Sequence, residues 1–192
     1  MNYLEYWNSI KEKKKNEQLI FIHTPKCAGT YATQILKDLE IKNKEHSLAL
    51  KNEGITFTII RDPVERFESL LNYRLNEKLP RNDWPTELEY VYHNKNITLN
   101  EIVSQMTDSN ILGFSPYKSL TYWSQNIDIL ITINQLHEFL NFFGYNYSIE
   151  NYEKKNVSNK LRNSFDEETK CRIKKLYNDD VILFNKIISL IK

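Results

Sequence analysis

Two short polar segments of this chain carry residues that could bind anions. In the first, Thr24–Gly29, Lys26 supplies a positive charge shortly after an apolar run, and Thr30 adds a hydroxyl. Backbone N–H groups at a helix start attract anions, and a neighbouring lysine adds to that attraction. In the second segment, Arg61 follows another apolar run and Ser69 lies eight residues later. A guanidinium and a hydroxyl are a suitable donor set for a phosphate monoester.

The apolar runs predict the strands that would position these residues. Continuous apolar stretches predict buried strands of a parallel sheet at 19–23, 55–60 and 127–133. Helical periodicity follows each of them, over about 30–39, 63–78 and 134–143. Further helices are predicted at 2–16, 98–106, 164–177 and 179–191, whereas 41–54 is predicted to be a polar connector. Because strands and helices alternate, we expect an α/β fold with three layers around a small central parallel sheet flanked by helices. Ligands bind such sheets at the carboxyl ends of the strands.

Capping patterns mark three of the predicted helix starts, at Asp62–Glu65, Thr98–Glu101 and Ser164–Glu167. In the first of these helices, helical spacing puts Ser69 on one face with Glu65, Arg66, Asn72 and Tyr73, while Val64, Phe67 and Leu71 share the opposite face. The apolar face predicts the core side, so Arg61 and Ser69 can both point out at the carboxyl edge of the sheet; the alternative is a Ser69 that lies on a wet face.

Length and composition limit the class of protein. A chain of 192 residues that is 41% hydrophobic fits one globular domain, 1–192. Its net charge of +1 gives no argument for a nucleic-acid or membrane partner. Its two cysteines fit a reducing compartment, and it has no secretory signal and no apolar run of about 20 residues. We therefore expect a cytoplasmic protein.

The first polar segment differs from two other anion-binding loops. A Walker A loop needs its Lys after the second Gly, with a Ser or Thr next to it. Here Lys26 precedes Gly29, and Cys27 follows the lysine. A cysteine phosphatase loop would need Arg six positions after Cys27, where the chain has Thr33. The residues therefore favour neither of these two loops.

FIHTPKCAGTY, at 21–31, resembles instead the 5′-phosphosulfate loop of sulfotransferases that use 3′-phosphoadenosine 5′-phosphosulfate (PAPS). IIRDPVERFESLLNY, at 59–73, looks like the 3′-phosphate motif of the carbohydrate sulfotransferase family that includes the uronosyl 2-O-sulfotransferases and the chondroitin and dermatan 4-O-sulfotransferases. Asn156-Val157-Ser158 is similar to a family NxS element, and a YxxDxxLF pattern is matched by Tyr177, Asp180, Leu183 and Phe184. This chain departs from the family in being short, in lacking a membrane anchor, and in having Leu70, Leu71 and Asn72 where the family has a Tyr-rich stretch.

The resemblance implies a P-loop-like sulfotransferase fold and PAPS as the sulfuryl donor. The residues that it implies for the 5′-phosphosulfate are Pro25, Lys26, Cys27, Ala28, Gly29, Thr30 and Tyr31. It implies Arg61 and Ser69 for the 3′-phosphate. A sulfuryl group carries less charge than a phosphoryl group, so we expect no metal requirement, and Lys26 would stabilise charge on the leaving phosphate.

The acceptor hydroxyl needs a general base, and histidine has a suitable pKa. We take His46 as the candidate, because the family pattern places its catalytic histidine just before the strand that Arg61 follows; Glu45 is the alternative. His23 is predicted to be a structural hydrogen bonder. Arg81 and Trp84 are the candidate contacts to a small-molecule or glycan acceptor. A P-loop-type small-molecule kinase and a catalytically silent nucleotide-binding or interaction protein stay open as alternative functions.

Overall fold

The computed structural model describes residues 2–75, 97–113, 118–147 and 164–191. The chain packs as two compact units, each assembled from separate stretches of sequence. The first, here called the sheet unit, comprises Met1–Arg61, Leu120–Val157 and Ile182–Lys192. The second, the helical unit, comprises Asp62–Ser119 and Ser158–Val181. Each unit has its own buried apolar core. The single domain over 1–192 stays a prediction.

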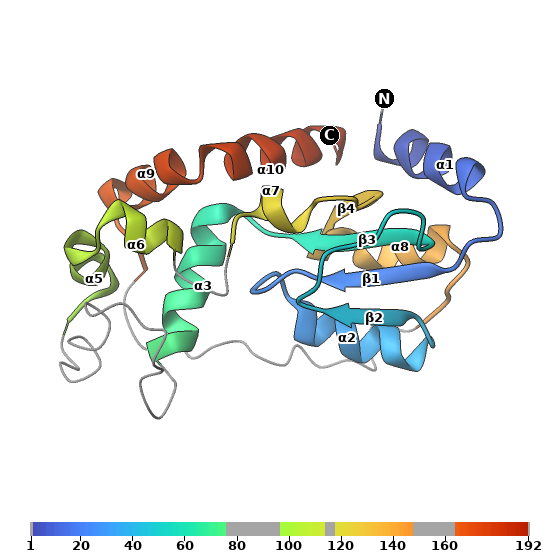
Figure 1. Cartoon of the computed structure of the whole chain (residues 1–192), viewed down its shortest axis with the longest axis horizontal. Coiled ribbons are helices and arrows are strands. Elements are labelled where there is room, and N and C mark those ends of the chain that lie inside the picture. The colour runs from blue at the N-terminus through green and yellow to red at the C-terminus, as the bar shows by residue number, and fades with distance from the viewer. Residues whose placement is uncertain (1, 76–96, 114–117, 148–163, 192) are drawn as a thin grey trace. The chain divides into compact units, whose positions relative to one another are not determined.

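Four parallel strands form the sheet in the described part of the sheet unit (Figure 1). They are β1 (Leu19–His23), β2 (Lys42–Glu45), β3 (Ile55–Ile60) and β4 (Ile129–Thr132), and their spatial order is β2-β1-β3-β4. The flanking helices are α1 (Tyr3–Lys13), α2 (Gly29–Asp38), α7 (Leu120–Trp123) and α8 (Leu136–Phe142), and the 3-10 turn η1 (Ile133–Gln135) precedes α8. The last helix of the chain is α10 (Asn178–Ile191). The predicted α/β class, with a small parallel sheet flanked by helices, is therefore confirmed.

One face of the sheet is covered by α2 and α8. Phe21 and Phe57 are register partners on neighbouring strands, so their side chains share this face. Phe57 packs on Phe139 of α8, with ring centroids 4.6 Å apart. Asn43 of β2, the other register partner of Phe21, donates from Nδ2 to Oγ1 of Thr33 in α2, at 3.2 Å. The buried aromatic side chains hold this layer, since each fully buried ring contributes roughly 1.5–3 kcal/mol.

The opposite face of β1 is covered by the segment 46–54, which connects β2 to β3. Ile20 and Ile22 of β1 form a buried cluster there with Ala49. Asn126 donates from Nδ2 to the carbonyl oxygen of Ala49 at 3.2 Å, which ties the connecting segment to the start of the β4 region. The connector therefore buries apolar surface although most of its residues are polar.

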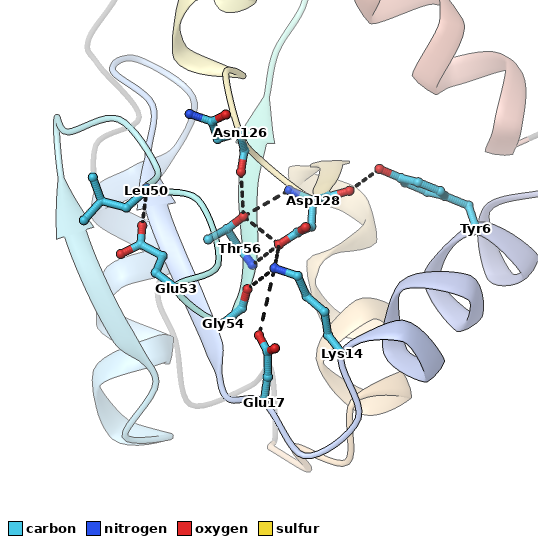
Figure 2. Close-up of polar contacts among 9 residues, drawn as sticks. All are labelled: Tyr6, Lys14, Glu17, Leu50, Glu53, Gly54, Thr56, Asn126 and Asp128. Carbon is cyan, nitrogen blue, oxygen red and sulfur yellow. Dashed lines mark hydrogen bonds and ion pairs between the residues drawn. The ribbon is translucent and has the colours of Figure 1, made fainter.

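A polar network joins the amino ends of β3 and β4 (Figure 2). The carboxylate oxygen Oδ2 of Asp128 accepts hydrogen bonds from Thr56 N at 2.8 Å, from Thr56 Oγ1 at 2.9 Å and from Lys14 Nζ at 2.8 Å. Lys14 also donates to the carbonyl oxygen of Gly54 and lies 3.9 Å from a carboxylate oxygen of Glu17. This network fixes the edge of the sheet opposite to the predicted ligand site.

The helical unit contains α3 (Pro63–Leu75), α5 (Leu99–Gln105), α6 (Asp108–Gly113) and α9 (Glu167–Leu176). Its core is a cluster of buried apolar side chains that includes Val64, Phe67, Leu71, Ile102 and Ile173. The predicted face of α3 that carries Val64, Phe67 and Leu71 is therefore the core face. On the opposite face, two residues are nevertheless buried: Arg66 is 6% exposed and Asn72 is 3% exposed. Arg66 is buried because its guanidinium donates to the carbonyl oxygen of Lys118 at 3.0 Å.

Helix capping follows the sequence at two of the three predicted starts. Oδ1 of Asp62 accepts from the backbone of Val64 at 2.9 Å and Glu65 at 3.1 Å, and Thr98 and Glu101 form the reciprocal capping box. The predicted cap at Ser164 is wrong. Helix α9 begins at Glu167, so its N-cap is Asp166 and not Ser164. Oδ1 of Asp166 accepts a hydrogen bond from Thr169 N at 2.8 Å.

The strand predicted at 127–133 is shorter in the structure. β4 ends at Thr132, because Gln135 Oε1 accepts from Thr132 N at 2.9 Å and so begins η1. No helix within the described residues has the length and apolarity needed to cross a membrane.

Candidate active site

A turn of unusual backbone conformation connects β1 to α2. Lys26 has φ of 61° and Ala28 has φ of 62° with ψ of 21°, so two non-glycine residues lie in the left-handed region. Ala28 is the N-cap of α2 and makes no side-chain capping hydrogen bond. A left-handed residue followed by a helical one turns successive N–H groups toward one concave side, which is an arrangement that binds anions. The turn therefore has a backbone form that can bind an anion.

The turn is fixed to the body of the sheet unit by buried side chains. Thr24 is 1% exposed, and its Oγ1 lies 2.8 Å from Oγ1 of Thr58, which also donates to the carbonyl oxygen of Ile22 at 2.6 Å. Cys27 is 1% exposed and belongs to the apolar core. A thiol so buried packs as an apolar group. The buried side chains of Thr24 and Cys27 therefore anchor the turn to the sheet unit.

The other predicted residues of the turn lie toward its surface. Lys26 and Tyr31 are half-buried, and Ala28 and Thr30 are exposed, while Pro25 and Gly29 are buried. The first turn of α2 contains no acidic residue. Because the only charge in this turn is that of Lys26, its electrostatic potential favours an anion.

The structure brings His46 to the same edge of the sheet as Lys26. The predicted polar connector 41–54 is wrong in its first part, because residues Lys42–Glu45 form β2, which pairs in parallel with β1. His23 is the register partner of Glu45, so His46 follows directly at the carboxyl end of both strands. The wholly polar sequence of β2 concealed it, because an edge strand with one partner needs few apolar side chains.

His23 lies at the centre of this edge. Its ring centroid is 4.8 Å from that of His46, with an interplanar angle of 45°, and 6.1 Å from that of Phe21. Burial lowers the pKa of His23 to about 4. His46 and Lys26 contribute to this shift, and Glu45 opposes it. His23 is therefore uncharged at neutral pH.

Two further features surround the histidine pair. Trp123 of α7 lies 6.5 Å from His46 between ring centroids and is 6% exposed. A Cβ atom at Gly29 would lie 1.7 Å from Nε2 of His23, so only glycine leaves room for this ring at the start of α2. The sequence predicts no role for Trp123 and only a structural hydrogen bond for His23, whereas the buried Nδ1 of His23 has no hydrogen-bond partner among the described residues. Recognising β2 would have revealed the histidine pair, since its register sets His46 beside the end of β1.

The two residues predicted to bind the 3′-phosphate belong to different units. Arg61 follows β3 at the carboxyl end of the strand in the sheet unit and is half-buried. Ser69 lies in α3 of the helical unit and is also half-buried. Their role as one phosphate site stays a prediction.

Several predicted residues lie outside the described residues, including the acceptor candidates Arg81 and Trp84 and the NxS element at 156–158. Of the other family pattern, Tyr177 donates to the carbonyl oxygen of Ile111 at 2.9 Å, and Asp180 is 1% exposed. Leu183 and Phe184 pack against the core of the sheet unit. Tyr177, Leu183 and Phe184 therefore pack in apolar cores, and Asp180 is a buried carboxylate.

Within the described part of the chain, no group of three or more His, Cys, Asp or Glu side chains is arranged to hold a metal ion. Comparisons with protein-family models, curated proteins and solved structures find no match to this chain. The assignment of a function therefore depends on the local motifs and on the geometry of the carboxyl edge.

Proposed function

We propose that this protein is a PAPS-dependent sulfotransferase that transfers a sulfuryl group to a hydroxyl of an acceptor, which we expect to be a carbohydrate or another small molecule. The observation that carries the proposal is the position of His46. A general base must lie beside the loop that holds the donor, and β2 brings His46 to the carboxyl edge where the turn with Lys26 begins.

The roles of the residues follow from the chemistry of sulfuryl transfer. The acceptor oxygen attacks sulfur in line, the S–O bond to the 5′-phosphate breaks, and the nucleoside 3′,5′-bisphosphate leaves. His46 accepts the proton of the acceptor hydroxyl, and Lys26 with the N–H groups of 28–30 offsets the charge on the leaving phosphate. One well-placed donor typically contributes about 10²–10³ in rate.

The order of residues in the turn supports a sulfuryl over a phosphoryl donor. The residue after Lys26 is the buried Cys27, so the position at which a Walker A loop presents a hydroxyl to Mg²⁺ holds a core side chain. A P-loop-type kinase using ATP is therefore the less favoured alternative. A catalytically silent nucleotide-binding protein would have the same loop geometry as a sulfotransferase and would differ from it only in lacking turnover.

Binding of the product nucleotide tests the proposed donor. At about 100 times its Kd, 3′-phosphoadenosine 5′-phosphate should stabilise the fold by about 2.7 kcal/mol, and the melting temperature should rise accordingly. ATP with Mg²⁺ should stabilise it less. Lys26→Ala should reduce the shift, and Lys37→Ala, which removes an exposed lysine from the last turn of the same helix, is the matched control. An equal or larger shift with ATP and Mg²⁺ would support the kinase.

A test of the base separates catalysis from binding. His46→Ala should lower kcat by about 10²–10⁴ and leave the affinity for the bisphosphate unchanged, because the base acts only on the acceptor. His137→Ala is the control, since this histidine lies on α8 and contacts Asn141 at 3.0 Å. If His46→Ala turns over normally, Glu45 becomes the candidate base.

A further inference from the structure

We propose that His23 is a positioning residue that holds His46 at the donor loop by a ring contact. The inference rests on the proposed function, because it takes His46 as the base of the transfer reaction. His23 itself, in this account, exchanges no proton with the substrate.

The His23 ring touches both the start of α2 and His46. A Cβ atom added to Gly29 would lie 1.7 Å from Nε2 of His23. The His23 ring therefore packs against Gly29, the first residue of α2. On another side it contacts His46, with ring centroids 4.8 Å apart. Phe21, whose ring is nearly parallel to that of His23 at 16°, supports it from within the strand. The His23 ring is therefore a spacer between the donor loop and the base.

The described residues hold the His46 side chain by few contacts. It is exposed, it follows a strand of four residues, and its φ of 46° lies in the left-handed region. Among the described residues, its ring contacts are with His23 and, at 6.5 Å, with Trp123. Trp123 is itself buried, so it can hold the His46 ring together with His23. Without the His23 ring, the base would keep one aromatic neighbour.

The charge state of His23 fits this role. Burial is the largest cause of the lowered pKa of His23, His46 and Lys26 lower it further, and Glu45 opposes them. The His23 ring is consequently uncharged at neutral pH. Two imidazolium rings at this separation would repel each other, whereas a neutral ring accepts a cationic neighbour. A neutral spacer therefore lets the base take up a proton.

Two substitutions separate this role from others. His23→Ala removes the ring and should lower kcat at least tenfold, with the bisphosphate Kd changed less than twofold. His23→Phe keeps an uncharged ring of similar width and should restore kcat to within about threefold of the wild type. The acid limb of the pH profile of kcat/KM should be the same in wild type and His23→Phe, because His23 does not titrate in that range. His137→Ala is the matched control for loss of a half-buried histidine.

A readout without turnover keeps the inference testable if the proposed function fails. The order of the His46 ring, measured by NMR relaxation of its Cε1–H group, should fall in His23→Ala and be kept in His23→Phe. If the wild type shows no sulfuryl transfer but this NMR result holds, the function is wrong and the spacer role stands.

The opposite outcomes overturn the inference. An inactive but folded His23→Phe variant would mean that His23 performs proton chemistry. Normal kcat in His23→Ala, with unchanged order of the His46 ring, would mean that His23 positions nothing. Parallel losses of bisphosphate affinity and kcat in His23→Ala would mean that the ring supports only the donor loop.

Discussion

At the scale of single residues, Gly29 and His23 are a close contact pair beside the proposed donor turn. Glycine is normally less favourable than alanine in a helix by about 1 kcal/mol. Gly29 reverses this rule because the His23 ring occupies the space of its missing Cβ. Glycine is therefore needed at position 29 because a Cβ atom would overlap the His23 ring, and not because the backbone conformation requires it.

Gly29→Ala should consequently destabilise the fold by about 1–3 kcal/mol, the usual cost of overpacking a filled site. Denaturant unfolding measures the change. The control is Gly144→Ala, because a Cβ atom added to Gly144 has no neighbour within 4 Å. Any loss of stability in this variant comes from backbone strain at its φ of 89°. If His23→Ala relieves the destabilisation by Gly29→Ala, the steric contact is its cause. A stabilising effect of Gly29→Ala would contradict the placement of the His23 ring.

The lowered pKa of His23 predicts a pH dependence of stability. Above pH 6.5 the ring is neutral in the folded and the unfolded chain, so it contributes no dependence. Between pH 6.5 and about 4 the unfolded chain binds a proton that the folded chain does not, so the free energy of unfolding falls as the pH falls. Allowing for solvent screening of this half-buried ring, the loss is about 1–2 kcal/mol. His23→Phe should remove that part of the slope, measured by urea unfolding from pH 4 to 7. An unchanged slope would show that His23 titrates normally.

At the scale of elements, the two buried strands and their following helices could be predicted because each has a continuous apolar run or a strong helical period. β1 and β3 begin and end where the sequence predicts. β2 could not be found in this way, since its sequence KNKE carries no apolar residue and its pairing with β1 is set by the turn out of α2. The candidate site was predictable at the donor turn, whereas the histidine pair depended on β2. The burial of Arg66 likewise depended on a partner, Lys118, that is distant in sequence.

The polar network at the amino edge should contribute to stability without affecting the site. Asp128→Ala leaves Thr56 and Lys14 without their shared acceptor and should cost about 2–4 kcal/mol. Bisphosphate affinity should be unchanged, because the network lies at the other end of the strands. Glu17→Ala removes an exposed carboxylate 3.9 Å from the same lysine and should change stability by less than about 0.5 kcal/mol. A loss of ligand affinity in folded Asp128→Ala would show that the two edges are coupled.

At the scale of the whole molecule, both compact units carry residues predicted to bind the 3′-phosphate, Arg61 in the sheet unit and Ser69 in the helical unit. Arg61→Ala should weaken binding of 3′-phosphoadenosine 5′-phosphate by about 1.5–3 kcal/mol, the contribution of a charged hydrogen-bonding group. Titration calorimetry with adenosine 5′-phosphate, which lacks the 3′-phosphate, is the control and should show little change. Equal losses with both nucleotides would remove Arg61 from the 3′-phosphate site.

The most direct test of the proposed function is transfer of ³⁵S from labelled PAPS to a pool of oligosaccharide and small-molecule acceptors, in the presence of a metal chelator. The account predicts labelled product with wild type and Lys37→Ala, and a rate about 10²–10³ lower with Lys26→Ala. Absence of labelled product from a wild-type protein that binds the bisphosphate fully would contradict sulfotransferase activity with the acceptors tested and favour a silent nucleotide-binding protein. Transfer of phosphate from ATP with Mg²⁺, without transfer of ³⁵S, would contradict the account in favour of a kinase.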